Sequence, residues 1–104
     1  MMDSTMYNYD RKAAFMEFYI NGGRNEDAAR YRQRDAVTAL NKVAIVEAKY
    51  KKDFCEFKSG STEMNDLCVL WLNNLADTRR VRMTSILRAY LKWCYQNDYI
   101  NAEQ

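Results

Sequence analysis

The chain has 104 residues, of which 48% are hydrophobic and 29% charged, a composition typical of one small globular domain. It contains no His, no Pro and only three Gly, which excludes Ser-His-Asp and Cys-His catalysis, His metal ligands and glycine-rich phosphate loops. The net charge is only +2, and the longest apolar run, Leu67 to Leu72, is far shorter than the roughly 20 residues that cross a bilayer. With no signal peptide visible either, we expect a single cytoplasmic domain over residues 1–104 that has no membrane partner.

Two helices are predicted in the first half of the chain. The first covers residues 9–20 and ends at residues 21–23, because glycine readily takes the left-handed conformation that closes a helix. The second covers residues 26–51, with Asn25 as its N-cap. Its apolar stripe holds Ala29, Ala36, Leu40, Val43, Ala44 and Glu47. A polar flank within about 120° of arc holds Arg30, Arg34, Thr38, Asn41, Lys42 and Lys49.

A third helix is predicted over residues 63–75, capped by Ser61 or Thr62 after a loop at residues 58–62. It is apolar nearly all round, so we expect it to lie at the centre of the core. The aromatic segment at residues 53–57, just before the loop, is expected to pack against the bundle.

The fourth helix, over residues 78–96, has the clearest amphipathic pattern. Its apolar stripe is Met83, Ile86, Leu87, Tyr90, Leu91 and Cys94. Opposite this stripe lie Thr78, Arg82, Ser85, Arg88 and Lys92, with Arg79 near that face. Asn97 and Asp98 are expected to end the helix, and Tyr99 and Ile100 to fold back on the core.

The basic residues are unevenly distributed. Residues 78–92 contain five basic side chains and no acidic one, and residues 24–52 form a second basic block. A positive face of this kind is typical of nucleic-acid binding, although a solvated helix surface has the same pattern. The candidate DNA-contacting residues are Arg30, Arg34, Thr38, Asn41, Lys42, Thr78, Arg79, Arg82, Ser85, Arg88 and Lys92.

Little in the sequence indicates catalysis, a cofactor, a metal or a small-molecule substrate. Cys55, Cys68 and Cys94 lack zinc-site spacing and are expected to act as small buried hydrophobes. The acidic pairs at residues 26–27 and 63 with 66 fit helix-end charges better than a general acid and base. Tyr90 lies on an apolar stripe, so we interpret it as a core residue.

The second half of the chain resembles the core-binding domain of tyrosine recombinases, the phage-type integrases. The resemblance is strongest over residues 65–75, over the helix motif Leu87-Arg88-Ala89-Tyr90-Leu91-Lys92-Trp93-Cys94, and over the exit Asn97-Asp98-Tyr99-Ile100-Asn101. Residues 15–20, Gly23 and the helix after Asn25 resemble the first two helices of the family. Asp98 and Ala102 stand where the family often has Gly and Pro.

The resemblance implies an all-α fold, a small orthogonal bundle of four to five helices of the SAM-like type. It implies half of a clamp on double-stranded DNA, with the second and fourth helices facing the duplex. It also implies that the catalytic residues belong to a separate C-terminal domain, so that these 104 residues are part of a longer, nucleoid-associated protein. Self-association on DNA would then occur through that longer protein.

The sequence also fits two alternatives. A phage or mobile-element repressor could keep the recombinase fold and its DNA binding without the catalysis. A helical protein-interaction module would instead use Trp71 or Trp93 in a partner groove. The direction of Trp93 discriminates the interaction module from the DNA-binding hypotheses, because at the edge of the apolar stripe this residue can be either buried or presented to a partner.

Overall fold

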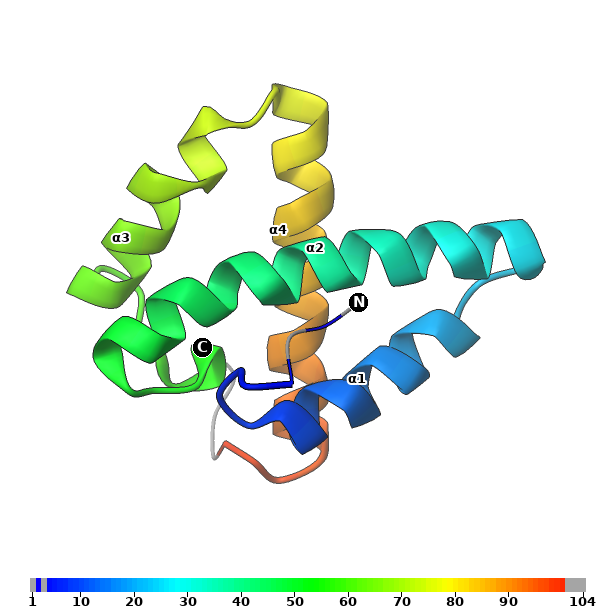
Figure 1. Cartoon of the computed structure of the whole chain (residues 1–104), viewed down its shortest axis with the longest axis horizontal. Helices are drawn as coiled ribbons and strands as arrows, with labels where there is room; N and C mark the ends of the chain where they lie inside the picture. The colour runs from blue at the N-terminus through cyan, green and yellow to red at the C-terminus, as the bar shows by residue number, and fades with distance from the viewer. Residues whose placement is uncertain (1, 3, 101–104) are drawn as a thin grey trace.

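A computed structural model describes residue 2 and residues 4–100, and this part of the chain is all-helical, as predicted. The four α-helices are α1 (Tyr9–Asn21), α2 (Glu26–Tyr50), α3 (Thr62–Leu70) and α4 (Asp77–Gln96). Two short 3₁₀ helices, η1 (Phe54–Glu56) and η2 (Leu72–Asn74), lie between them. The long α2 crosses in front of α4 and packs against α1, α3 and α4 (Figure 1). Asn101 and Ala102, in the family-like exit pattern, lie outside the described residues.

Both predicted N-caps are confirmed. The side chain of Asn25 accepts a hydrogen bond from the Ala28 amide at 2.9 Å, and that of Ser61 accepts one from the Met64 amide at 3.2 Å. Each bond satisfies an amide that the first turn of a helix leaves without a partner. These local signals explain why both helix starts could be placed from sequence to within one residue.

The end of α1 differs from the prediction in its conformation. Gly22 is right-handed, with φ −77°, so no left-handed glycine closes this helix. Glycine is required at the next position for space, because a Cβ on Gly23 would lie 2.8 Å from the Ala29 amide nitrogen. The loop therefore passes directly against the first turn of α2.

The predicted apolar stripe of α4 is confirmed, since all six of its residues are buried. Phe15 of α1 packs its ring against Tyr90 at 5.2 Å and Trp93 at 5.8 Å between centroids. Trp93 is only 8% exposed, and the Tyr99 ring covers it at 5.5 Å. The chain after α4 thus folds back on the core, as expected, and Trp93 is a core residue.

The prediction for the third helix was wrong in length and in position. The helix ends at Leu70, because Trp71 leaves helical geometry with φ −135° and ψ −65°, and η2 follows as a separate turn. Within α3 only Leu67 is buried, whereas Val69 and Leu70 are 54% and 62% exposed. This helix lies at the edge of the bundle (Figure 1), so its outer apolar residues have nothing to pack against.

Candidate nucleic-acid interface

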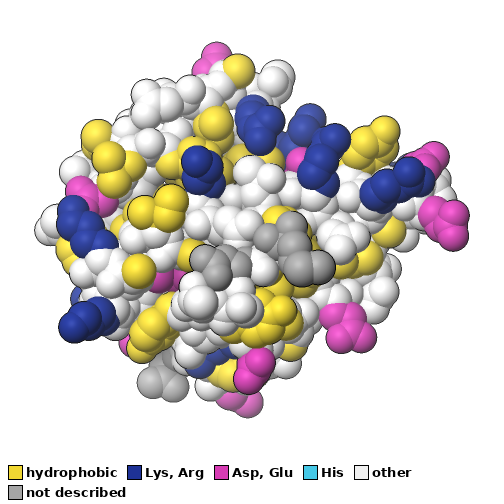
Figure 2. All heavy atoms as spheres, viewed as in Figure 1, with side chains coloured by type: hydrophobic (Ala, Val, Ile, Leu, Met, Phe, Trp, Pro, Cys, Tyr) yellow, Lys and Arg dark blue, Asp and Glu magenta, His cyan; other side chains and the backbone are white. Residues whose placement is uncertain are grey.

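Exposed basic side chains gather where α2 and α4 cross. Figure 2 shows Lys and Arg side chains in a row over α2 and the N-terminal end of α4. We name this surface the α2–α4 basic face and define it by five exposed residues: Arg30, Arg34, Lys42, Arg79 and Arg82. It joins the two basic blocks of the sequence, which are separated by an acidic stretch.

One carboxylate brings arginines from both helices together. Asp35 of α2 has an oxygen 3.6 Å from the Nε atom of Arg34 and its other oxygen 3.7 Å from an Nη atom of Arg82. Its side chain is 16% exposed, whereas both arginines are more than half exposed. These distances exceed hydrogen-bond length, so the guanidinium N–H groups keep their capacity to donate to an outside acceptor. Asp35 lowers the repulsion between the two arginines without engaging their donors.

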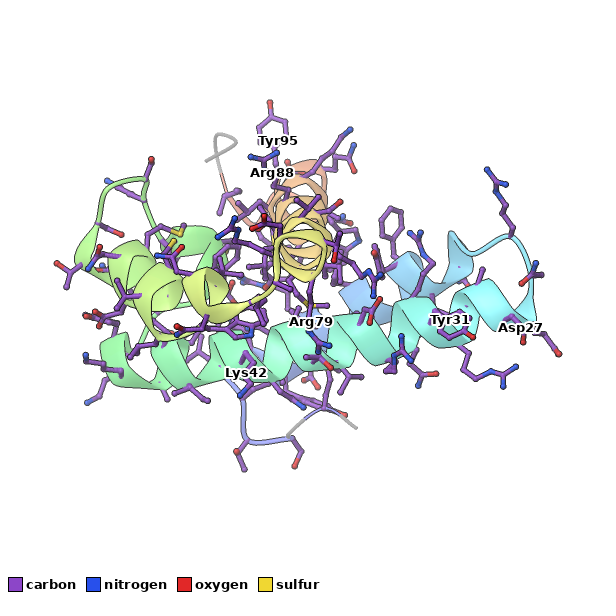
Figure 3. All side chains as sticks on the ribbon, turned by 90° about the horizontal axis from the view of Figure 1, so that it is seen from above. Asp27, Tyr31, Lys42, Arg79, Arg88 and Tyr95 are labelled. Atoms are coloured by element: carbon purple, nitrogen blue, oxygen red, sulfur yellow. The ribbon has the colours of Figure 1, made fainter. Side chains whose placement is uncertain are left out.

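The rest of α2 contributes unequally to this face. Lys42 projects from the outer side of α2 (Figure 3), and no ion pair involves it among the described residues. Arg30 forms an exposed ion pair with Asp27 at 2.6 Å. The Thr38 hydroxyl donates to the Arg34 carbonyl at 3.0 Å. Asn41 is half-buried and borders a small hollow beside the N-terminal segment, with Thr5, Met6 and Tyr7.

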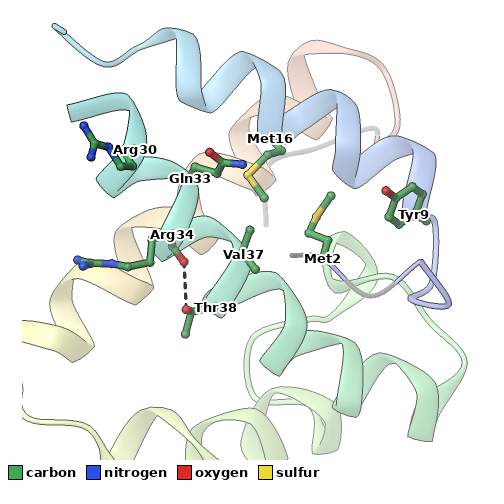
Figure 4. A pocket seen from close by; sticks show the side chains of 8 residues that line it. All are labelled: Met2, Tyr9, Met16, Arg30, Gln33, Arg34, Val37 and Thr38. Atoms are coloured by element: carbon green, nitrogen blue, oxygen red, sulfur yellow. Dashed lines mark hydrogen bonds between the residues drawn. The ribbon is translucent and has the colours of Figure 1, made fainter. Parts of the chain in front are cut away.

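A hollow of about 620 Å³ opens between α1 and α2 beside the basic face. Arg30, Arg34 and Thr38 form part of its wall, and Met2, Tyr9, Met16, Gln33 and Val37 complete it (Figure 4). The hollow therefore combines two guanidinium groups with an apolar floor.

The candidate residues of α4 do not share one surface. Figure 3 shows Arg79 on the α2 side of the helix and Arg88 on the opposite side. At about 100° per residue, nine positions rotate the helix by roughly half a turn, which explains this placement. Lys92, one helical turn after Arg88, lies on the same side as Arg88, and Thr78 and Ser85 are exposed between the two sides. The polar face that the sequence predicted for this helix is therefore divided between two sides of α4.

The acidic pairs occupy positions suited to ion pairing. Glu26 and Asp27 are exposed in the first turn of α2. In α3, Glu63 pairs with Lys52 at 3.3 Å, and Asp66 pairs with Lys49 at 2.8 Å. Hydrogen bonds from Lys49 and Tyr50 lower the pKa of Asp66. Within residues 2 and 4–100, no group of three or more His, Cys, Asp or Glu side chains is arranged to hold a metal ion.

A buried charged cluster, which the sequence did not indicate to us, lies beneath these helices. Lys12 of α1 is fully buried, with its Nζ atom 2.9 Å from a Glu47 oxygen and 2.9 Å from an Asp53 oxygen. The Tyr90 hydroxyl donates to Asp53 at 2.9 Å. The Phe54 amide donates to Glu47 at 2.6 Å. The cluster thus joins α1, α2, η1 and α4 through hydrogen bonds to charged groups.

The two carboxyl groups of this cluster titrate in opposite directions. Burial raises the pKa of Glu47 to about 7 despite the nearby charge of Lys12. One of its oxygens, Oε1, is buried and has no hydrogen-bond partner among the described residues. Burial also acts to raise the pKa of Asp53, but the charge of Lys12 and the hydrogen bonds from Cys55 and Asn8 outweigh it, so the net shift is downward. Near neutral pH, Asp53 therefore carries the negative charge and Glu47 lies close to its midpoint.

Comparison with known proteins gives no further information on the function of these surfaces. No protein-family model matches the chain, and neither a curated protein nor a solved structure matches it. Across the described residues, no helix is both long enough and apolar enough to span a membrane.

Proposed function

We propose that the chain binds duplex DNA through the α2–α4 basic face. The observation that carries the proposal is the convergence of Arg34 and Arg82, from two distant parts of the sequence, on the two oxygens of Asp35. Arg79 and Lys42 extend the same surface, and neither forms an ion pair within the described part of the chain. Exposed guanidinium and ammonium groups in a row suit a backbone of regularly spaced phosphates.

The recombinase resemblance supports a more specific form of this proposal. In it, the chain grips DNA as the core-binding domain of a tyrosine recombinase, and strand cleavage belongs to another domain. A repressor that retains the same domain for DNA binding alone remains the second form. In both forms α2 and α4 face the duplex, which agrees with the location of the basic face.

The protein-interaction alternative depended on an accessible tryptophan, and Trp93 is not accessible. Trp93 packs between Phe15 and Tyr99 in the core and offers no ring to a partner. Trp71 is half-buried at the end of α3. DNA binding is therefore the function we favour for the basic face.

The test is fluorescence anisotropy of a labelled 30-base-pair duplex of random sequence, titrated with the protein between about 50 and 200 mM salt. If all five cations of the face contact phosphates, log K should fall with log salt with a slope of about −4.5. Arg79→Ala and Arg82→Ala should each weaken binding and reduce the slope by about 1.

The matched control is Arg24→Ala, which removes an exposed arginine from the loop between α1 and α2. It should leave the salt slope unchanged. If Arg24→Ala and Arg79→Ala weaken binding equally, the attraction is a general charge effect and the proposed face is wrong. Absence of binding at low salt would also overturn the proposal.

A further inference from the structure

An apolar groove runs between α3 and α4 on the side of the molecule that the DNA proposal does not use. It has a volume of about 400 Å³, and buried core residues form its floor. The floor and walls are Phe54, Phe57, Met64, Leu67, Cys68, Leu72, Leu87 and Leu91. Because most of these side chains belong to the packed core, the groove is formed before any partner arrives.

A basic ridge on α4 borders the groove. Arg80, Thr84 and Arg88 recur every four residues, so they stand in one row along the helix. The same three residues also line a second hollow on the outer side of the row, together with Val81 and Ser85. Val81 is 69% exposed, so apolar surface continues beyond the ridge.

The charge of this ridge is only partly balanced. Arg80 pairs with Asp77 at 2.7 Å, but that carboxylate is 90% exposed and lies a turn away from the groove. Arg88 has no ion pair among the described residues, and Lys92 continues the row one turn further. None of the described residues that line the groove is acidic. The combination is an apolar floor with a positive edge.

We infer that the α3–α4 groove docks a protein segment that carries large apolar side chains next to Asp or Glu residues. Leu or Phe side chains of an amphipathic helix would fill the floor, and its carboxylates would pair with Arg88 and Arg80. The apolar floor favours a peptide over nucleic acid, whose phosphates gain nothing from Leu and Phe side chains. The inference concerns a second partner and does not depend on DNA binding.

Both partners could be held at the same time. Arg79 and Arg88 lie on opposite sides of α4 (Figure 3), so occupation of one face leaves the other free. The domain would then bring an acidic protein to the site where it binds DNA. The same geometry provides two charge-reversal variants on one helix that separate the two surfaces.

Cys68 offers a direct readout of the groove. All three cysteines are free thiols. Cys68 lines the groove and is half-buried, whereas Cys55 and Cys94 are fully buried. In the native protein a maleimide should therefore modify Cys68 first, and a bound segment should slow that reaction. The rate is followed by mass spectrometry of the intact chain.

The probe is a synthetic amphipathic peptide with Leu and Phe at helical i, i+3, i+4 and i+7 positions and Glu at the others. Its matched control has Lys in place of every Glu. The Glu peptide should slow modification of Cys68 in a saturable way, and the Lys peptide should not. Arg88→Glu should weaken this protection about tenfold, whereas Arg79→Glu, with the same charge change, should leave it intact.

Three outcomes would overturn the inference. Equal protection by the Glu and Lys peptides would show that the positive ridge does not discriminate between acidic and basic partners. Protection by a DNA duplex in place of the peptide would make the groove a nucleic-acid surface. Protection that rises with protein concentration alone would identify the occupant as a second copy of this chain.

Discussion

The buried cluster around Lys12 and the α2–α4 basic face use similar cations under opposite conditions. Lys12 is sealed from solvent and has two carboxylates at 2.9 Å, whereas Arg82 is more than half exposed and lies 3.7 Å from the Asp35 carboxylate. In the interior, a charge without a partner costs several kcal/mol, so every donor of Lys12 must be used by the fold. At the surface, water solvates the arginines, and their donors remain available to another molecule.

This comparison separates stability from binding. Substitutions in the cluster should act on folding, and substitutions on the basic face should act on DNA binding with little effect on folding.

Lys12→Met should have the largest effect. It leaves Glu47 and Asp53 buried near each other without their shared cation, so we expect a loss of about 3–5 kcal/mol of unfolding free energy. Small domains have roughly 5–15 kcal/mol in total, so the variant should be much less stable or unfolded at 25 °C. Urea unfolding followed by circular dichroism measures the change.

The double variant Lys12→Met with Glu47→Gln is the control for this interpretation. It removes one of the two buried acids, so it should recover part of the lost stability. If the single variant costs less than about 1 kcal/mol, the cluster is not the structural centre that its geometry indicates.

The pH dependence of stability should follow Glu47. Its pKa is 4.5 in the unfolded chain and about 7 in the fold, so between these values the folded state holds more protons. Stability due to this group is therefore full below pH 4.5 and is lost as the pH rises through 7. The difference corresponds to roughly 3.5 kcal/mol at most, since one pKa unit equals about 1.4 kcal/mol.

Glu47→Gln should remove this loss, which urea unfolding at pH 5 and pH 8 would detect. Glu17→Gln, an exposed change on α1, should leave the pH profile unaltered. Below pH 4 the wild type and Glu47→Gln should both lose stability, because the lowered pKa of Asp53 makes its protonation unfavourable in the fold. A wild-type profile that is flat between pH 5 and pH 8 would contradict the assignment to Glu47.

The smallest effect on folding is expected for Arg79→Ala. This side chain is exposed and makes no ion pair in the described part of the chain, so unfolding free energy should change by no more than about 0.5 kcal/mol. The same variant should still weaken DNA binding. A large loss of stability would show that the basic face is part of the fold, and the contrast with the cluster would fail.

Local patterns in the sequence predicted the elements better than their packing. Asn25 and Ser61 cap helices within a few residues of themselves, and the stripe of α4 repeats within one helix, so both signals can be found locally. The position of α3 depends on what surrounds it. An apolar run such as Val69-Leu70 has the same composition at the edge of a bundle as at its centre, and here it is exposed.

The buried cluster was missed because its partners lie far apart in sequence. Lys12 meets Asp53 across 41 residues, and no single helix contains both. A signal was nevertheless present, since Glu47 stands on the predicted apolar stripe of the second helix and Lys12 lies three residues before Phe15 on the first. The division of the candidate site on α4 could also have been predicted, because the nine-residue spacing of Arg79 and Arg88 places them about half a turn apart.

The aromatic packing around α4 gives the protein an internal optical reporter. The two tryptophans of the chain have different surroundings, with Trp93 enclosed by Phe15, Tyr90 and Tyr99 and Trp71 half-exposed where α3 ends. In Trp71→Phe, all indole fluorescence would come from the junction of α1, α4 and the C-terminal turn. Its emission would follow the core alone, so peptide at the groove or DNA at the basic face could be titrated while the same sample reports whether the interior stays closed.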